Sequence, residues 1–184
     1  MEELVKLADV QPDYEKYPYV CADTETTGLS KNAEVIEVTL TEFNKSGEKG
    51  VSLHYLCEPI SGFIEPGASR VNGLYMKDVA GYPSYLKGGV KEDCAEFLSK
   101  RTFVAHNAEY DLGKMKINPN NVYDTLLKAR KKWPRNRNNL KACINRIGKK
   151  WNDEEAHRAS YDVDKCIELF LYFETEMNAQ QTLI

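Results

Sequence analysis

The sequence lacks a long hydrophobic run, and this absence limits where the protein can work. Nowhere in its 184 residues do 18 apolar residues follow one another, so no segment is long enough to cross a bilayer as a helix. The first residues, Met1 to Lys6, have neither the basic region nor the apolar region of a secretory signal. We therefore expect a cytoplasmic protein without a membrane partner.

Paired cysteine motifs are also missing. The five cysteines are odd in number, widely spaced and never arranged as C-x-x-C, which argues against a zinc site and against a disulfide framework. Internal repeats, low-complexity tracts and an evident linker are absent as well. We therefore expect a single domain over residues 18–178, preceded by an N-terminal extension at 1–17 and followed by a C-terminal tail at 179–184.

Acidic residues are absent from one stretch, residues 125–152, which we call the basic segment. It holds ten basic residues, whereas the 15 basic and 28 acidic residues elsewhere leave the rest of the chain at −13. A local block of positive charge attracts and orients a polyanion. A solvated helical face is the alternative explanation. The ten residues are Lys128, Arg130, Lys131, Lys132, Arg135, Arg137, Lys141, Arg146, Lys149 and Lys150.

Apolar periodicity predicts three strands in the first third of the chain, at 19–25, 34–43 and 51–57. Prolines and glycines indicate an irregular crossing at 59–89 with one short helix around 74–79. Strands first, followed by alternating helices and strands, indicate a layered α/β protein with a mixed sheet. The elements predicted after the crossing are a helix from Val90, a strand at 103–105, and helices at 108–117, 124–132, 139–148 and 157–177.

Two carboxylates end the first predicted strand, immediately before the break at Thr26-Thr27-Gly28. Asp23 and Glu25 are two residues apart, so on a strand they project from the same face, about 7 Å from each other along the chain. Two acids held this closely repel each other unless a cation neutralises them, and hard divalent ions such as Mg²⁺ or Mn²⁺ prefer oxygen ligands. The alternative is a strand end with two solvated acids.

Further acids follow at the junctions of later elements, and three motifs carry a family resemblance. Asp23-Thr24-Glu25-Thr26-Thr27-Gly28 is similar to the first motif of the DEDDh branch of 3′-to-5′ exonucleases. Val104-Ala105-His106-Asn107-Ala108-Glu109-Tyr110-Asp111 resembles the second, and His157-Arg158-Ala159-Ser160-Tyr161-Asp162 fits the H-x-A-x-x-D of the third. This is the family of the polymerase epsilon-type proofreading subunit, RNase T and oligoribonuclease. The motifs occur in the family's order and span nearly the whole chain.

The resemblance implies an RNase H-like fold, a mixed five-stranded sheet flanked by helices. It further implies that Asp23, Glu25, Asp111 and Asp162 bind two divalent ions, Mg²⁺ or Mn²⁺. Such ions activate water and neutralise the leaving oxygen in phosphodiester hydrolysis. His157 would be the general base, since imidazole titrates near neutral pH. The sister branch of the family has a tyrosine where this chain has Arg158.

The implied function is hydrolysis at a single-stranded 3′ end that releases 5′-mononucleotides. DNA is the expected substrate, in proofreading or 3′-end trimming. RNA trimming, or clearance of short oligonucleotides, is the alternative, and a catalytically inactive scaffold is a remote one. A polymerase or a sliding clamp is a candidate partner, the latter because the tail Gln180-Gln181-Thr182-Leu183-Ile184 faintly resembles clamp-docking peptides.

The resemblance also suggests substrate contacts for Thr26, Thr27, Leu29 and Asn107. Alternatively, the two threonines form an ordinary strand exit and Asn107 caps the helix that follows it. From the basic segment, Lys131, Lys132 and Arg135 are expected to hold backbone phosphates without reading sequence.

Two positions depart from the family pattern. Asn72 stands where a histidine is common, which leaves a substrate contact there open. Tyr110 replaces a usual phenylalanine, and we expect this change to have little effect. Asp164 lies about 200° round the predicted helix from Asp162 and should face away from the site.

Overall fold

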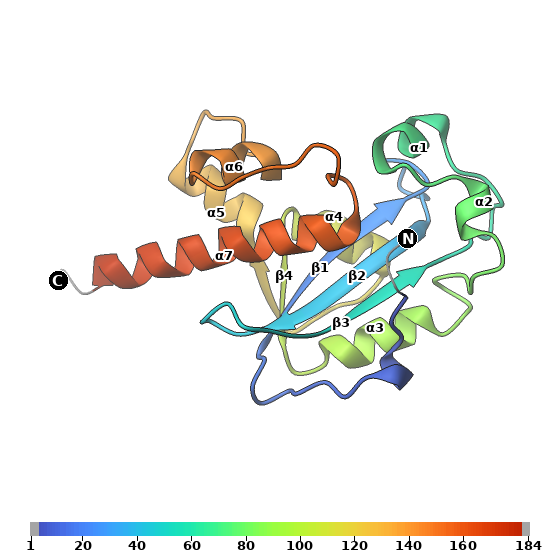
Figure 1. Cartoon of the computed structure of the whole chain (residues 1–184), viewed down its shortest axis with the longest axis horizontal. Coiled ribbons are helices and arrows are strands. Elements are labelled where there is room, and N and C mark those ends of the chain that lie inside the picture. The colour runs from blue at the N-terminus through green and yellow to red at the C-terminus, as the bar shows by residue number, and fades with distance from the viewer. Residues whose placement is uncertain (1–3, 182–184) are drawn as a thin grey trace.

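The computed structural model describes residues 4–181, with side chains up to Met177. At its centre is a five-stranded sheet in the order β3-β2-β1-β4-β5 (Figure 1). β1 is antiparallel to β2 and parallel to β4, and β4 is parallel to β5. The mixed five-stranded sheet that the resemblance implies is therefore confirmed. The strands are β1 (Tyr19–Thr26), β2 (Val35–Phe43), β3 (Lys49–Leu56), β4 (Thr102–Ala105) and β5 (Asn121–Asp124).

Helices cover both faces of this sheet, which explains why β2 is buried at every position. Val20 and Ala22 of β1 pack with Phe97 of α3 on one face, whereas Cys21 packs with Val163 of α7 on the other. Figure 1 shows α7 running across the sheet, with α5 and α6 beside it. The helices are α1 (Pro66–Asn72), α2 (Met76–Val79), α3 (Val90–Leu98), α4 (Ala108–Met115), α5 (Thr125–Lys132), α6 (Leu140–Arg146) and α7 (Ala159–Gln181).

Three elements differ from the sequence-based predictions. The crossing segment holds two short helices where one was expected, and α1 has proline at its start and Gly73 in the left-handed conformation after its end. β5 was not predicted, because it is only four residues long and lies at the sheet edge. The last helix begins at Ala159, so the prediction that placed His157 on it is wrong.

Residues preceding β1 pack along the sheet. Val5 exchanges backbone hydrogen bonds with His54 of β3, and the Leu7 N–H donates to the Tyr55 hydroxyl at 2.8 Å. This contact covers part of the outer strand, whose free backbone groups would otherwise invite pairing with another chain. Among the described helices, none combines the length and apolar character that a bilayer crossing needs.

A buried ion pair joins β2 to the residue that precedes β4. Glu42 and Arg101 are 1% and 2% exposed, and their side chains meet at 2.7 Å. The second Glu42 oxygen accepts the Val51 N–H at 3.1 Å. The guanidinium also lies over the rings of Tyr14 and Phe97, which joins the segment before β1 to α3.

Candidate active site

Four carboxylates converge where β1 ends. Asp23 and Glu25 follow Cys21 on the α7 face of the strand, and the register of the β1–β2 pair shifts directly after Glu25. Asp111 lies in the first turn of α4 and Asp162 in the first turn of α7. Three elements that are distant in sequence therefore bring their acids to one point, as the resemblance implied.

Burial and mutual repulsion dominate the electrostatics of this cluster. Burial raises the pKa of the Asp23 carboxyl well above its ordinary value, and the charge of Asp111 raises it further. Burial likewise raises the pKa of Glu25 to about 8, of Asp111 to about 7 and of Asp162 to about 6. Such groups resist ionisation together unless positive charge compensates them.

The pH dependence of stability follows from these shifts. The folded-state pKa values lie above the ordinary values near 4, so the folded protein holds more protons than the unfolded chain between about pH 4 and pH 8. The free energy of unfolding should therefore fall as the pH rises. In EDTA, we expect a melting temperature several degrees lower at pH 8 than at pH 5.5, and Mg²⁺ should remove most of this difference. A flat or rising profile in EDTA would contradict the predicted repulsion.

His157 stands over two of these acids. Its backbone adopts a left-handed conformation with φ of 63°, in the irregular turns directly before α7, and its side chain is exposed. Single ligand atoms of Glu25, His157 and Asp162 all lie within 4.8 Å of one another. Because His157 lies in this left-handed turn and not in α7, its imidazole is exposed to solvent and still lies close to the acid cluster.

A cavity of about 550 Å³, which we call the edge cavity, opens beside these groups. Glu25 and His157 lie on its wall together with Thr26, Leu29 and Asn107. Leu29 is 86% exposed, which is unusual for a large apolar side chain and suits contact with an apolar partner. The Asn107 side chain makes no capping hydrogen bond to α4, so the capping explanation for this residue is not met.

The N-terminus of α4 is capped by the side chain of Asp124 and not by that of Asn107. Its carboxylate accepts the Ala108 N–H at 3.0 Å and, at the start of α5, the Leu126 N–H at 2.8 Å. Thr27 also has a structural contact, since its buried hydroxyl accepts the Glu34 N–H at 3.0 Å. For Thr27 the strand-exit explanation fits the structure better than a side-chain contact with substrate.

Sequence reasoning undervalued two polar neighbours of the site. The Tyr110 hydroxyl lies 2.9 Å from the Thr26 hydroxyl, so the replacement of phenylalanine adds a contact that we expected not to matter. Asn72 is 3% exposed, and its amide donates to the Thr26 carbonyl at 3.4 Å while its side chain also interacts with Glu25. Both residues fix the strand end that carries the acids.

A buried network behind the site was missed altogether. Glu37 of β2 is fully buried and lies opposite Glu25 in the strand register. One of its oxygens accepts from Arg158 at 2.8 Å and lies 3.0 Å from the His54 ring. Arg158, directly after His157, is thereby tied to the sheet. In the sequence, Glu37 is one of the polar residues that alternate with apolar residues along β2, so nothing marks it as buried. The burial of Glu37 and its contact with Arg158 become evident only from the packing of α7 over β2.

The basic segment divides into two groups. Arg130 and Arg135 line a cavity of about 690 Å³, the arginine cavity, which shares Asn107 with the edge cavity. Lys132, in contrast, donates to Glu176 of α7 at 2.5 Å, and Lys141 pairs with Asp153 at 2.6 Å. Lys132 is thus paired with α7, and the expected phosphate contacts of Lys131, Lys132 and Arg135 stay predictions.

Asp162 and Asp164, both on α7, differ in how their charges are compensated. Asp164 pairs with Lys49 at 2.9 Å, which confirms that it faces away from Asp162. Asp162 keeps one buried carboxylate oxygen without a hydrogen-bond partner in the described part of the chain. A cluster made of oxygen donors, one of them unsatisfied, suits a hard cation.

Comparison with known proteins agrees with this geometry. The sequence model of the exonuclease family matches residues 20–170. The DNA polymerase III subunit epsilon of Haemophilus influenzae is 28% identical over 170 residues, covering 83% of this chain and 65% of that protein. Ribonuclease T of Shewanella sp. (strain MR-4) is 28% identical over 178 residues, covering 83% of this chain and 80% of that protein. The chain thus spans about two thirds of the length of the polymerase III epsilon subunits that it matches.

Solved structures share the fold at lower sequence identity. Exonuclease X in complex with 5′ overhanging duplex DNA has a TM-score of 0.68 and 20% identity, covering 86% of this chain and 93% of that one. E. coli Exonuclease I in complex with a dT13 oligonucleotide has a TM-score of 0.74 and 15% identity, covering 90% and 42%. The chain belongs to the exonuclease family that includes the polymerase III epsilon subunit and ribonuclease T.

Proposed function

We propose that this chain is a metal-dependent, DEDDh-type exonuclease that removes 5′-mononucleotides from a single-stranded 3′ end. One observation carries the proposal: four carboxylates from β1, α4 and α7 meet beside an exposed histidine at the wall of an open cavity. Acids that lie this close together and have raised pKa values are typical of functional sites, and bound cations would compensate their charges.

Asp23, Glu25, Asp111 and Asp162 would hold two divalent ions. The oxygen-only donor set and the unsatisfied Asp162 oxygen support this assignment. When bound, such ions activate a water molecule and offset the charge that develops on the leaving 3′ oxygen. The hydroxyl of Thr24 donates to Asp111 at 2.8 Å, which holds that carboxylate in place.

His157 acts as the general base in this proposal. Its ring is within reach of both Glu25 and Asp162 and open to solvent, so it can accept the proton of an attacking water and release it to bulk. The Glu37–Arg158 ion pair anchors the residue that follows it, which restrains the left-handed turn.

The edge cavity receives the terminal nucleotide. Leu29 offers an exposed apolar surface for the base, and Thr26 and Asn107 offer polar groups for the sugar and phosphate. The strand continues toward Arg130 and Arg135, because Asn107 borders both cavities. These contacts address the backbone and not base identity.

The decisive experiment compares substrates under matched conditions. End-labelled single-stranded DNA, duplex DNA with a mismatched 3′ end, and RNA are each incubated with Mg²⁺ or with EDTA. We expect stepwise shortening from the 3′ end in Mg²⁺ and none in EDTA. Preference for RNA would favour the second candidate, which the similarity to a ribonuclease T supports. Cleavage in EDTA, or internal cleavage, would contradict the proposal.

The salt dependence of binding tests the two groups of the basic segment. An Arg130→Gln, Arg135→Gln variant should bind single strands more weakly, and the slope of log K against log salt should fall by about 0.7 for each phosphate that is no longer neutralised. Lys132→Gln with Lys141→Gln removes the same charge from the two lysines that pair with Glu176 and Asp153, so it should leave the slope nearly unchanged. Binding is measured by fluorescence anisotropy without divalent ions. Equal effects of both variants would contradict the assignment.

A polymerase is a candidate partner because relatives are named DNA polymerase III subunit epsilon. A sliding clamp is a candidate because of the C-terminal tail alone. The proposed clamp-docking tail, residues 180–184, has its side chains outside the described residues. A pull-down with and without residues 178–184 tests that contact.

A further inference from the structure

The turn that carries His157 is held by β2. His157 has a φ of 63°, in the left-handed region that residues other than glycine rarely adopt unless their surroundings fix the backbone. The two residues that follow it both contact the Glu37 carboxylate. The Arg158 guanidinium donates to one oxygen at 2.8 Å, and the Ala159 N–H donates to the other at 3.5 Å. One carboxylate therefore fixes both the side chain and the backbone that come directly after His157.

Glu37 is itself firmly held. It is fully buried and lies opposite Glu25 in the β1–β2 register. The oxygen that Arg158 contacts also lies 3.0 Å from Nε2 of His54, a residue of β3 that is 6% exposed. The backbone of His54 in turn exchanges hydrogen bonds with Val5. A carboxylate buried among such partners has little freedom to move, so it is a rigid support for the turn.

The same support reaches the acid cluster. The Arg158 carbonyl accepts the Asp162 N–H at 3.1 Å, in the first turn of α7. Ligand atoms of His157, Asp162 and Glu25 lie within 4.8 Å of one another. A displacement of a catalytic group by about 1 Å can lower the rate roughly a hundredfold. The position of the imidazole relative to the acids therefore depends on the geometry of the turn.

We propose that Glu37 is a positioning residue for His157, because through Arg158 and Ala159 it holds the left-handed turn that places the imidazole beside the acids. This inference rests on the proposed function, in which His157 is the general base. Glu37 is fully buried, so it acts on the reaction through the turn and not through the substrate. Its loss should lower kcat and leave KM for a single strand unchanged.

The test is a double-mutant cycle on 3′-end release from single-stranded DNA in Mg²⁺. Glu37→Leu removes the carboxylate and should lower kcat at least tenfold, while KM changes less than twofold. In a His157→Gln background no imidazole remains to be positioned, so Glu37→Leu should change kcat less than twofold. A purely structural role of Glu37 predicts the same factor of loss in both backgrounds.

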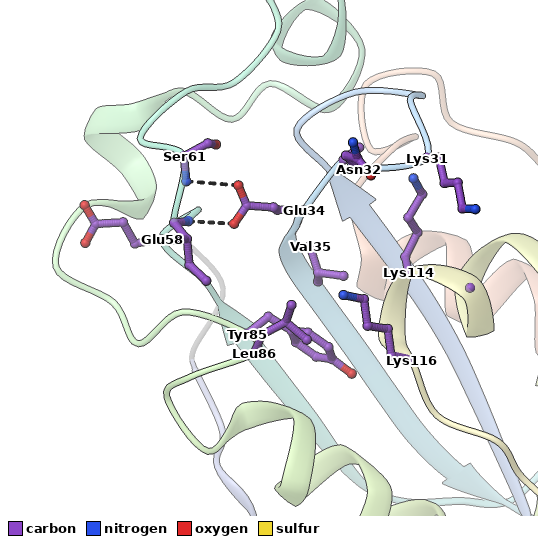
Figure 2. Close-up of a pocket in the computed structure, with 13 residues that line it drawn as sticks. Lys31, Asn32, Glu34, Val35, Glu58, Ser61, Tyr85, Leu86, Lys114 and Lys116 are labelled. Carbon is purple, nitrogen blue, oxygen red and sulfur yellow. Dashed lines mark hydrogen bonds between the residues drawn. The ribbon is translucent and has the colours of Figure 1, made fainter.

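Glu34 supplies the matched control. This carboxylate lies directly before β2, at the wall of a cavity of about 620 Å³. Figure 2 shows that it also accepts two backbone N–H groups, those of Ile60 at 2.6 Å and Ser61 at 3.0 Å. The segment that Glu34 holds is not the one that carries His157. Glu34→Leu should therefore leave kcat and KM within twofold of the unmodified protein.

The charge of Glu37 also acts on Glu25 and Asp162, which provides a second route to a change in kcat. Arg158→Met separates the two routes, because it breaks the link to the turn and leaves this charge in place. It should give a similar loss of kcat, with the same dependence on His157, and keep the Mg²⁺ concentration for half-maximal rate within twofold. The same variant supplies the comparison if Glu37→Leu does not fold.

Two outcomes would overturn the inference: full kcat in either folded variant, or a loss of kcat that is equally large with and without His157. Failure of the proposed function is a different result. In that case the unmodified protein releases no nucleotides in Mg²⁺, or His157→Gln alone keeps full kcat.

Discussion

Asp23→Asn should lower kcat for 3′-end release by roughly a thousandfold or more, as loss of a group that holds transition-state charge typically does. Asp23 is the acid that the other three surround, since the charges of Asp111, Glu25 and Asp162 all act on it. Asparagine keeps the shape of the side chain but removes the charge. The variant should therefore remain folded and lose the chemistry.

The same substitution should stabilise the protein in the absence of metal. Ionising a buried carboxylate among other acids costs free energy, and Asp23→Asn removes one of these charges. We expect a higher melting temperature than that of the unmodified protein at pH 8 in EDTA, and a smaller increase on addition of Mg²⁺. Loss of activity combined with a gain in stability separates a catalytic role from a structural one.

Asp164→Asn is the matched control for this prediction. Asp164 lies on the same helix as Asp162 but pairs with Lys49, and its side chain is 49% exposed. The variant should keep kcat close to that of the unmodified protein. If Asp23→Asn retained full activity, the inactive-scaffold alternative or another active centre would have to be considered.

Glu42→Ala should lower the free energy of unfolding by about 3–5 kcal/mol, the usual cost of leaving a buried charge without its partner. The Arg101 guanidinium is 2% exposed, and two of its nitrogens have no hydrogen-bond partner among the described residues. Without Glu42, its charge would have no counterion at this site. Urea denaturation monitored by fluorescence measures the loss.

Two comparisons make this second prediction specific. The Glu42→Leu, Arg101→Met variant removes both charges and should be more stable than Glu42→Ala, because no buried charge remains unpaired. Glu48→Ala removes one partner of the Lys16–Glu48 pair, whose side chains are each 49% exposed, and should lower the free energy of unfolding far less, because water screens this pair. Similar losses for Glu42→Ala and Glu48→Ala would contradict the importance of burial.

The acids of the site could be predicted because each stands at a recognisable junction. Asp23 and Glu25 end an apolar strand, and Asp111 follows another within one turn of a helix. The apolar–polar alternation along the strands and the order of the three motifs can both be read from the sequence. Together they suffice to predict that these acids lie close to one another. The left-handed turn at His157 has no comparable signal, so its place before the helix became evident only in the structure.

Contacts between distant elements could not be predicted in the same way. Lys132 belongs by sequence to a uniformly basic stretch, yet its partner Glu176 is 44 residues away on α7. Glu37 resembles the polar residues of a half-buried strand, and only the helix above it makes it a buried anchor for Arg158. A sequence displays charges, whereas tertiary packing decides which of them remain free.

The carboxylate of Asp124 joins two helices that carry groups of the proposed site. It binds the first N–H groups of both α4 and α5, where the dipoles of the two helices favour a negative charge. One of these helices carries Asp111 and the other carries Arg130. Asp124 thus fixes the distance between the acid cluster and Arg130. Under the proposed function, the spacing between the hydrolysed bond and a phosphate bound at Arg130 would be the same in every turnover.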